Sequence, residues 1–391
     1  MQISLQDPVL TSLSQAFSER FGHCASLFAC APGRLEILGN HTDYNQGTVL
    51  SVAIDRSAKV AAAANPQAEA GMVCRLYDVK GKSARQFRLD ALDRKIPRDW
   101  ANYIKGIVCE FNARGIVVPA FDMVVTGDVP LSAGMSSSAA LEMAVVKALD
   151  KLCGSALGWQ EMARIGQGSE NHYVGANTGL LDQFSSLMGR QGHLIHSDFR
   201  SLEVVNVPVP QGTSFVVANS HVKHNLTNEY NERRADCEEA TRILGVPALR
   251  DVTPVQLEAA RSRLEDRVYR RARHVVEEID RVARGSQALA QGDVASFGKL
   301  MDLSHDSSRM NFENSCPELD VLVSLGRKLP GHLGARLSGG GFGGITVHLV
   351  ESCHGEAYAR QLQEGYQKET GLSTQPMILQ AADGAQVLSL S

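Results

Sequence analysis

The segment that most constrains this chain is a run of small residues at 127–140, GDVPLSAGMSSSAA, that leads directly into a helix-forming stretch. Glycine and serine let the backbone wrap closely around an anion. The start of the following helix offers free N–H groups and the positive end of the helix dipole. This glycine–serine segment therefore predicts a phosphate-binding turn. The alternative is a serine-rich helix cap that binds nothing.

A second glycine run, LSGGGFGG at 337–344, has the G-x-G-x-x-G spacing of a dinucleotide-binding turn. That turn must open a helix, whereas the strand-like run ITVHLV follows here, so we expect two strands joined by a tight turn between Arg336 and Val350. Gly81-Lys82-Ser83 is not a Walker A motif, because Leu76 stands where the first glycine belongs. It is expected to be a hairpin turn, and any phosphate would be bound without a Walker lysine.

A third unusual stretch, GRLEILGNHTDYNQG at 33–47, concentrates polar side chains between two strand-like runs. We call it the polar segment. It brings an arginine, two carboxylates, a histidine and asparagines close together in the chain. Such a density of donors and acceptors is typical of a site for a polyhydroxylated ligand. A solvated turn, rich in asparagine because turns favour it, is the alternative.

The length and the order of elements predict the fold class. A chain of 391 residues is long enough for two domains. Strands and helices occur in separate clusters with no βαβ alternation, which predicts an α+β fold. Prolines at 208 and 210 place the boundary between domains 1–208 and 209–391. We expect helices at 8–22, 100–114, 137–154, 159–174, 227–243 and 267–292, and strands at 28–32, 47–64 (one or two), 121–126, within 192–220 and within 336–350.

Charge and composition exclude several classes of function. Lys and Arg number 39 against 43 Asp and Glu, for a net charge of -4, so no general attraction to nucleic acid or to an anionic membrane is expected. No stretch approaches the length of an apolar membrane span, and no signal peptide is visible at the N-terminus. The eight cysteines contain no C-x-x-C pair, which favours reduced thiols and a cytoplasmic protein.

These segments together resemble the three signatures of the GHMP small-molecule kinases. APGRLEILGNHTDYNQGTVL, with its HTDYN core, is similar to the galactokinase branch; GDVPLSAGMSSSAALEMA resembles the phosphate loop of the family, and LSGGGFGG its third motif. The resemblance continues, in chain order, through WANYIKG, GLLDQF, HVKHNLTNEYNERRADCEEA, RARHVVEEI and SCPELD, and covers residues 30–350. It implies a two-domain α+β fold with the active site in the cleft between the domains.

The resemblance also implies the chemistry and the residues that perform it. The expected reaction is phosphorylation of a sugar at its 1-position by ATP with Mg²⁺, most simply of galactose. Asp182 matches the catalytic aspartate, as a base or as an orienting group, and Arg34 matches its partner. The residues that the resemblance assigns to the ligands are Asn40, His41, Asp43, Tyr230 and Gly340 for the sugar, Gly134, Met135, Ser136, Ser137, Ser138 and Ala139 for ATP, and Ser138 and Glu170 for Mg²⁺. Sugar and ATP are the expected partners, and a monomer is expected.

The sequence departs from the galactokinase pattern at one informative position. Asn40 stands where galactokinases usually carry a glutamate that is expected to bind the outer hydroxyls of the sugar. An amide, unlike a carboxylate, does not repel a uronic acid. Galactose remains the expected substrate, with galacturonate, arabinose and N-acetylgalactosamine as alternatives. A protein that senses sugar and ATP without catalysis is a further alternative, which the presence of Arg34, Asp182 and Glu170 disfavours.

Overall fold

The computed structural model describes residues 8–66, 72–131, 134–176, 178–222 and 226–388. Its larger sheet has eight strands, in the order β12-β1-β2-β5-β3-β4, with β6 paired to β2 and β7 to β6. The strands of this sheet are β1 (Leu27–Leu38), β2 (Thr48–Ala64), β3 (Val73–Asp78), β4 (Ser83–Arg88), β5 (Phe121–Gly127), β6 (His193–Asp198), β7 (Glu203–Pro208) and β12 (Gln386–Leu388).

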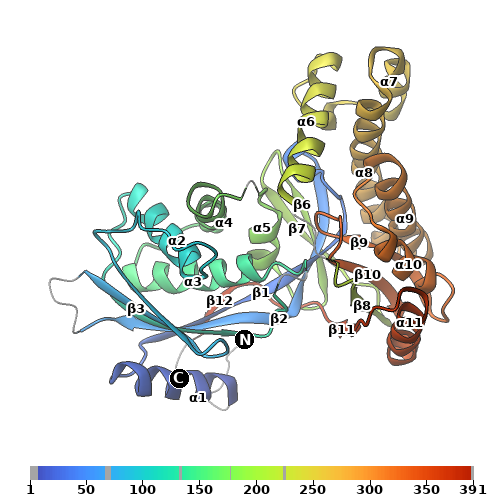
Figure 1. Cartoon of the computed structure of the whole chain (residues 1–391). Coiled ribbons are helices and arrows are strands. Elements are labelled where there is room, and N and C mark those ends of the chain that lie inside the picture. Colours follow the sequence, from blue (N-terminus) through green and yellow to red (C-terminus); the bar gives the residue numbers. More distant parts are fainter. Residues whose placement is uncertain (1–7, 67–71, 132–133, 177, 223–225, 389–391) are drawn as a thin grey trace.

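Helices cover both faces of this sheet (Figure 1). One face packs against α2 (Ala101–Ala113), α3 (Ser137–Cys153), α4 (Trp159–Gly168) and α5 (Leu181–Met188), and the other against α1 (Pro8–Phe21). Side chains alternate along β2, so that Val60 and Ala62 face the first group of helices whereas Ala61 and Ala63 face α1. This two-sided burial explains why β2 reads as a nearly continuous apolar run.

A smaller sheet follows, in the order β11-β8-β10-β9. Its strands are β8 (Thr213–Asn219), β9 (His332–Ser338), β10 (Ile345–Glu351) and β11 (Met377–Leu379). Its faces pack against α9 (Val294–Ser307) on one side and against α10 (Pro317–Gly326) and α11 (Gly355–Thr370) on the other. The apolar core that includes α9 continues into the larger sheet, so the two parts share one core.

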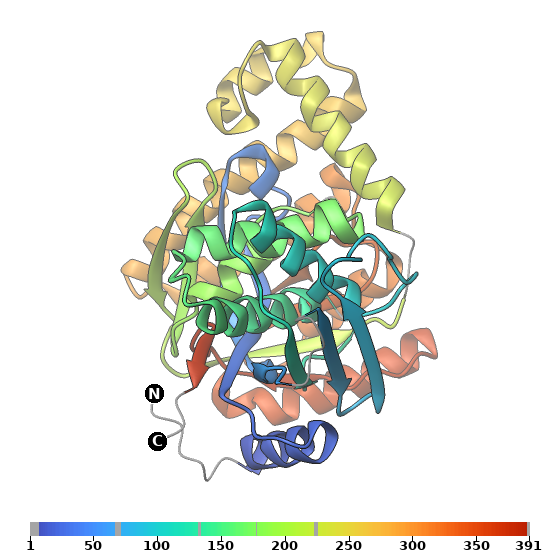
Figure 2. The same ribbon diagram turned by 90° about the vertical axis from the view of Figure 1, so that its left-hand side faces the viewer.

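Three helices project beyond the sheets: α6 (Leu226–Leu244), α7 (Pro254–Ala259) and α8 (Asp266–Ala290) (Figure 2). They pack on each other through their own apolar cluster, which reaches Tyr44 of the polar segment and Phe312 after α9. Helix α8 therefore lies beside the loop between β1 and β2. No helix among the described residues is long and apolar enough to cross a bilayer.

Most expected elements are present, and the α+β class is confirmed. Helix α3 begins at Ser137 and ends before Gly154, which adopts the left-handed conformation that glycine favours at helix ends. Lys80 and Lys82 lie in the turn of the β3–β4 hairpin, as predicted from DVKGKS. The run at 337–344 connects β9 to β10, as its context indicated.

Two expectations were wrong in detail. The strand expected at 28–32 continues to Leu38, so the first part of the polar segment is buried strand, in which Arg34 and Glu36 pair with charged partners far along the chain. The run at 47–64 forms one strand from Thr48, one of the two possibilities expected. The helix expected at 159–174 changes at Ser169 into a π-helical turn, Ser169–Val174, a form frequent at functional sites.

The predicted boundary at 208/209 lies between β7 of the larger sheet and β8 of the smaller one. The last strand, β12, returns across this boundary and pairs with β1 from Phe28 to Cys30. The division into 1–208 and 209–391 stays a prediction, to which this returning strand is an exception.

Candidate active site

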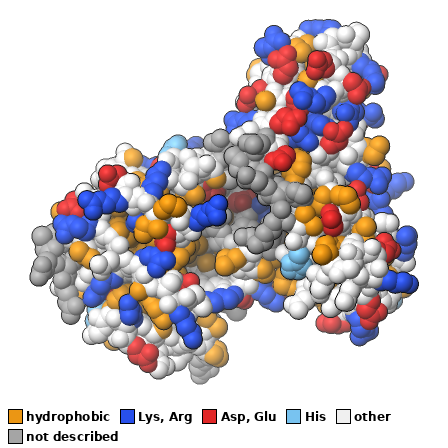
Figure 3. Space-filling model, in the orientation of Figure 1, with side chains coloured by type: hydrophobic (Ala, Val, Ile, Leu, Met, Phe, Trp, Pro, Cys, Tyr) orange, Lys and Arg blue, Asp and Glu red, His pale blue; other side chains and the backbone are white. Residues whose placement is uncertain are grey.

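A cavity of about 500 Å³ lies where the two parts of the molecule meet, and Figure 3 shows the surface hollowed there. Its walls come from four places in the chain: β1 and the loop after it, the segment 174–182, the start of α6, and the turn between β9 and β10. Of the residues predicted from the sequence, it brings together Arg34, Asn40, His41, Asp43, Asp182, Tyr230 and Gly340. It therefore joins the polar segment to the turn 337–344.

Asp182, in the first turn of α5, links two of these walls. Its Oδ1 accepts hydrogen bonds from Nε of Arg34 at 2.7 Å and Nη2 of Arg34 at 2.6 Å. Its Oδ2 accepts the hydroxyl of Ser136 at the glycine–serine segment. Charge-assisted bonds of this kind stabilise the ionised carboxylate. Arg34 also donates from Nη1 to the carbonyl of Gly134 at 2.6 Å, which ties β1 to the same segment.

The glycine–serine segment is held against β1 by its backbone. The carbonyl of Met135 accepts the N–H of Arg34 at 3.1 Å. A Cβ on Gly33 would lie 2.6 Å from that carbonyl, so this approach requires glycine. Gly134 and Ser136 adopt positive φ angles of 71° and 53°, which turn the chain sharply into α3.

The predicted ATP residues lie at the start of α3. The side chains of Met135 and Ala139 are buried, so their contribution to an ATP site is through the backbone, whereas Ser136, Ser137 and Ser138 are partly exposed. Ser132 and Ala133 of the same segment lie outside the described residues, as do residues 223–225 of the motif that precedes Tyr230.

Glu170 lies in the π-helical turn beside Ser138. Its carboxylate bonds to the Ser138 hydroxyl, to Oγ1 of Thr178 at 2.8 Å and to Nε2 of Gln183 at 3.2 Å. Burial raises the pKa of Glu170, and the negative charge of Asp182 raises it further. A serine hydroxyl and a carboxylate are oxygen ligands of the kind that Mg²⁺ prefers, and this excess of negative charge favours a cation. The residues present therefore fit Mg²⁺.

Glu142 stands behind this group and was not predicted from the sequence. It lies one helical turn after Ser138 on α3 and is fully buried. Gln183 Nε2 bridges from Glu170 to Oε2 of Glu142 at 3.0 Å. Burial and the charge of Glu170 raise the pKa of Glu142 well above its usual range. The i, i+4 spacing from Ser138 is the signal that could have identified it.

His41 lines the cavity, and its ring packs against those of Tyr44, Tyr230 and Phe312. Its Nε2 lies 3.2 Å from the carbonyl of Gly340, and its Nδ1 lies 3.0 Å from the hydroxyl of Tyr44. Because a carbonyl only accepts, Nε2 carries the hydrogen and Nδ1 accepts from Tyr44. Burial lowers the pKa of His41 to about 4, so the ring is neutral near pH 7.

Asp43 lies across the cavity, next to Gly179. Burial raises the pKa of Asp43 to about 7, and the carboxylates of Glu36 and Asp182 contribute in the same direction. A Cβ on Gly179 would lie 1.8 Å from Oδ2 of Asp43, so the glycine leaves the room that this carboxylate occupies. Asp43 can therefore gain or lose a proton near neutral pH.

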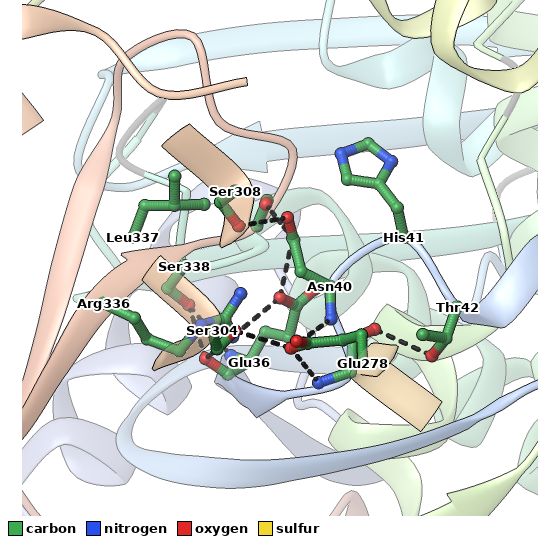
Figure 4. A network of polar contacts seen from close by, with 12 residues as sticks. Glu36, Asn40, His41, Thr42, Glu278, Ser304, Ser308, Arg336, Leu337 and Ser338 are labelled. Carbon is green, nitrogen blue, oxygen red and sulfur yellow. Dashed lines mark hydrogen bonds and ion pairs between the residues drawn. The ribbon is translucent and has the colours of Figure 1, made fainter. Parts of the chain in front are cut away.

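Asn40 is fully buried at the cavity wall, in a network with residues from α8, α9 and β9 (Figure 4). The backbone at Asn40 is held by Glu278 of α8, which accepts hydrogen bonds from the N–H groups of Gly39 at 3.0 Å and Asn40 at 3.2 Å. Ser304 and Arg281 also donate to Glu278, each at 2.6 Å. Burial alone would raise the pKa of Glu278, but the nearby arginines 281 and 336 hold it below its usual range.

Glu278, Arg281 and Arg336 were missed by sequence reasoning. Glu278 lies in the motif RARHVVEEI, but the sequence assigns it no role, because Glu278 and Arg336 lie more than 200 residues from the polar segment that they contact. Arg281 reaches this segment through Glu278. Glu36 carried a signal that was available: it is two residues from Arg34, and strand alternation places such residues on one face.

Models of protein families match three regions of the chain. The galactokinase galactose-binding signature covers residues 15–64, the GHMP kinases N terminal domain covers 102–190, and the GHMP kinases C terminal model covers 286–368. The first of these contains the polar segment, and the second contains the whole glycine–serine segment together with Asp182.

Known proteins match over nearly the whole length. Galactokinase of Homo sapiens is 41% identical, over 98% of this chain and 97% of that protein, and galactokinase of Actinobacillus pleuropneumoniae serotype 5b (strain L20) is 41% identical, over 96% and 98%. The crystal structure of Lactococcus lactis galactokinase complexed with galactose superposes with a TM-score of 0.92 at 30% identity, covering 97% of this chain and 99% of that one. A mevalonate kinase structure, at 17% identity and a TM-score of 0.63, shares the fold.

Proposed function

This chain belongs to the galactokinase family of the GHMP kinases and is a sugar kinase, and on that premise we propose that it transfers the γ-phosphoryl group of ATP to the anomeric hydroxyl of galactose, releasing ADP. The observation that carries this proposal is the position of Asp182. Its two oxygens bond to Arg34 and to Ser136, so that one carboxylate lies both in the cavity of the polar segment and at the glycine–serine segment.

Asp182 takes the proton of the sugar hydroxyl or orients that hydroxyl toward the phosphate. Arg34 pairs with this carboxylate and orients it, because Nε donates to Oδ1 and Nη2 lies 2.6 Å from the same oxygen. Its Nη1 holds the carbonyl of Gly134 and so fixes the distance between the acceptor side and the phosphate side. This positioning matters because phosphoryl transfer depends on alignment and on neutralising charge more than on covalent chemistry.

The start of α3 receives the phosphates. The free N–H groups of its first turn, with the hydroxyl of Ser137, are donors available to an anion. Ser138 and Glu170 would hold Mg²⁺, which when bound would neutralise charge on the β- and γ-phosphates. Gln183 orients the Glu170 carboxylate from behind.

The polar segment receives the sugar. His41, Asp43 and Tyr230 converge on the cavity with the backbone of Gly340, and together they offer acceptors, donors and an aromatic surface. A neutral ring at His41 and a carboxylate at Asp43 suit hydroxyl groups, which both donate and accept. Aromatic groups add the apolar surface on which the C–H face of a sugar packs.

Release of ADP tests the proposal directly. The enzyme is given ATP, Mg²⁺ and, in turn, galactose, galacturonate, arabinose and N-acetylgalactosamine. We expect galactose to give the highest kcat/KM of the four. The Asp182→Asn variant, with galactose binding followed by calorimetry, is the matched control, because it removes the base and keeps the shape.

Two outcomes would contradict the proposal. A different sugar ranking above galactose would replace the substrate. Binding of galactose and ATP with no ADP released would replace catalysis by sensing.

A further inference from the structure

The side chain of Asn40 has no capacity left for a ligand. Its Nδ2 donates to Oε1 of Glu36 and to the carbonyl of Gly339, each at 2.8 Å. Its Oδ1 accepts from Nδ2 of Asn314 at 2.8 Å and from the hydroxyl of Ser308 at 3.4 Å. A carboxylate and a carbonyl can only accept, so this orientation of the amide is fixed. A sugar hydroxyl could bond to Asn40 only by displacing one of these partners.

Glu36 is the residue that these contacts orient. Its side chain is 4% exposed and borders the cavity. Nη1 of Arg336, at 3.0 Å, and Nδ2 of Asn40 both bond to the same oxygen, Oε1. Within the part of the chain that the structure describes, Oε2 accepts no hydrogen bond. Glu36 is therefore an oriented carboxylate with one oxygen uncommitted at the wall of the cavity (Figure 4).

The backbone at Glu36 is fixed as well. The hydroxyl of Ser338 accepts the N–H of Glu36 and donates to its carbonyl, both at 3.0 Å. Along a strand, residues two apart share a face and lie about 7 Å from each other. Glu36 therefore lies one such step from Arg34, which holds Asp182. A ring whose reacting hydroxyl is at Asp182 has its distant hydroxyls near Glu36.

We propose that Glu36, rather than Asn40, is the sugar-binding residue at the end of the cavity away from Asp182, and that Asn40 positions the carboxylate of Glu36. The inference rests on the proposed function, because it takes a sugar hydroxyl as the ligand. Glu36 and Asn40 together still provide a carboxylate oxygen that can accept a hydrogen bond from a sugar hydroxyl, although position 40 itself carries an amide.

This arrangement has a consequence for specificity. Glu36, Asp43 and Asp182 all border the cavity, against the cations Arg34 and Arg336. Each arginine is paired with one of these carboxylates. Among the described residues, a sugar that carries its own carboxylate would meet the uncommitted oxygen of Glu36 with both of these arginines already paired. The site therefore selects neutral sugars and excludes galacturonate, contrary to what Asn40 alone implies.

Glu36→Gln tests the first part of the proposal with a panel of singly deoxygenated galactoses as substrates. We expect KM for galactose to rise about tenfold or more, since a charged hydrogen bond is lost, with kcat and the KM for ATP changed less than about threefold. For one deoxy sugar, the one that lacks the hydroxyl bound by Glu36, the variant and the wild type should have the same KM. Glu239→Gln, which removes an exposed carboxylate on α6, is the matched control.

Two results with galactose and the deoxygenated galactoses would contradict the proposal. An unchanged KM for galactose in Glu36→Gln, or an equal further loss with every deoxy sugar, overturns it. Asn40→Ala separates positioning from contact: it should raise KM only when Glu36 is present, so Glu36→Gln/Asn40→Ala should resemble Glu36→Gln alone. Additive losses in that double variant assign the sugar contact to Asn40 instead.

A measurement on the unaltered enzyme keeps the inference testable should the variants fail to fold. Galacturonate is added as a competitor against galactose, and we expect an inhibition constant at least about a hundredfold above the KM of galactose, as for an unpaired charge at a buried site. Inhibition comparable to the KM of galactose overturns the exclusion. Wild-type enzyme that turns over no neutral sugar refutes the proposed function, and turnover with an insensitive Glu36→Gln refutes only this inference.

Discussion

The polar segment and the glycine–serine segment both contact Asp182 but are built in opposite ways. In the polar segment, nearly every polar group already has a protein partner, and these partners include residues of α8, of β9 and of the turn that follows α9. The glycine–serine segment is held by the carbonyls of Gly134 and Met135 and by the hydroxyl of Ser136, which donates to Asp182, before a helix start whose side chains make no capping bond. The proposed sugar side is thus organised by the fold, whereas the proposed phosphate side leaves the backbone N–H groups of the helix start free for a ligand.

The difference indicates how protein stability and ligand affinity depend on each segment. An oriented network loses little freedom when a ligand binds, but each member depends on the others. A turn with free N–H groups reduces the stability of the fold only slightly, and it becomes ordered when an anion binds. Changes in the polar segment should therefore affect stability and sugar affinity together, and changes in the glycine–serine segment should affect ATP alone.

Asp182 is the point where the two sides meet, and its change should have the largest effect. Asp182→Asn removes the base and the partner of Arg34 without changing the shape, so kcat should fall about 10²–10⁴-fold. Steady-state assays give kcat, and calorimetry checks that galactose still binds. A kcat within a few-fold of wild type would show that neither side depends on this carboxylate.

Glu278→Gln breaks the network on the sugar side. It leaves Arg281 without its buried partner and weakens the acceptor for the N–H groups of Gly39 and Asn40. We expect a loss of about 3 kcal/mol in the free energy of unfolding, measured in urea, together with a higher KM for galactose.

Ser137→Ala is the counterpart on the phosphate side. Its free energy of unfolding should stay within about 0.5 kcal/mol of wild type, while KM for ATP rises. Equal losses of stability in Glu278→Gln and Ser137→Ala would remove the distinction between the two segments.

Gly179→Ala tests the room left for Asp43. The added Cβ would lie 1.8 Å from Oδ2 of Asp43, so the carboxylate must move, and KM for galactose should rise on the order of tenfold to a hundredfold. Gly158→Ala is the control, because the nearest atom to its Cβ is the side-chain end of Gln160 at 3.9 Å. If both variants have wild-type KM values, Asp43 does not contact the sugar from this position.

The smallest effect is expected from pH. The pKa of Asp43 is raised to about 7, so the side chain is ionised above pH 7 and gains a proton below it. The ionised form accepts more hydrogen bonds from hydroxyls, so KM for galactose should rise as pH falls, by at most about tenfold per unit below pH 7. Asp43→Asn should abolish this slope. A slope that persists in Asp43→Asn belongs to another group.

The same two segments show which features of the structure can be predicted from the sequence and which cannot. The glycine–serine segment is local: its glycines, its serines and the helix after it lie within one stretch, so the turn and the bounds of α3 could be predicted from pattern alone. The polar segment is not local. Strand β1 continues into this segment because Arg34 pairs with Asp182 and Glu36 pairs with Arg336. Arg336 is 300 residues away from Glu36 in the chain.

For this reason the roles at the sugar site were harder to assign than those at the phosphate site. The sequence identifies Asn40 as unusual, but only the fold shows that its amide is occupied by Glu36, Gly339 and Asn314. Glu142 is intermediate: its spacing from Ser138 is visible in the sequence, while the bridge through Gln183 requires the structure.

The reaction that we propose for this chain is phosphorylation of galactose at its anomeric hydroxyl. Phosphorus NMR of the products formed from ATP, Mg²⁺ and galactose tests this proposal most directly, because it identifies which oxygen carries the phosphate. We expect a single new phosphate ester, coupled to the hydrogen on C1, that Asp182→Asn forms far more slowly. A phosphate on any other hydroxyl, or ATP and galactose left unchanged, would contradict it.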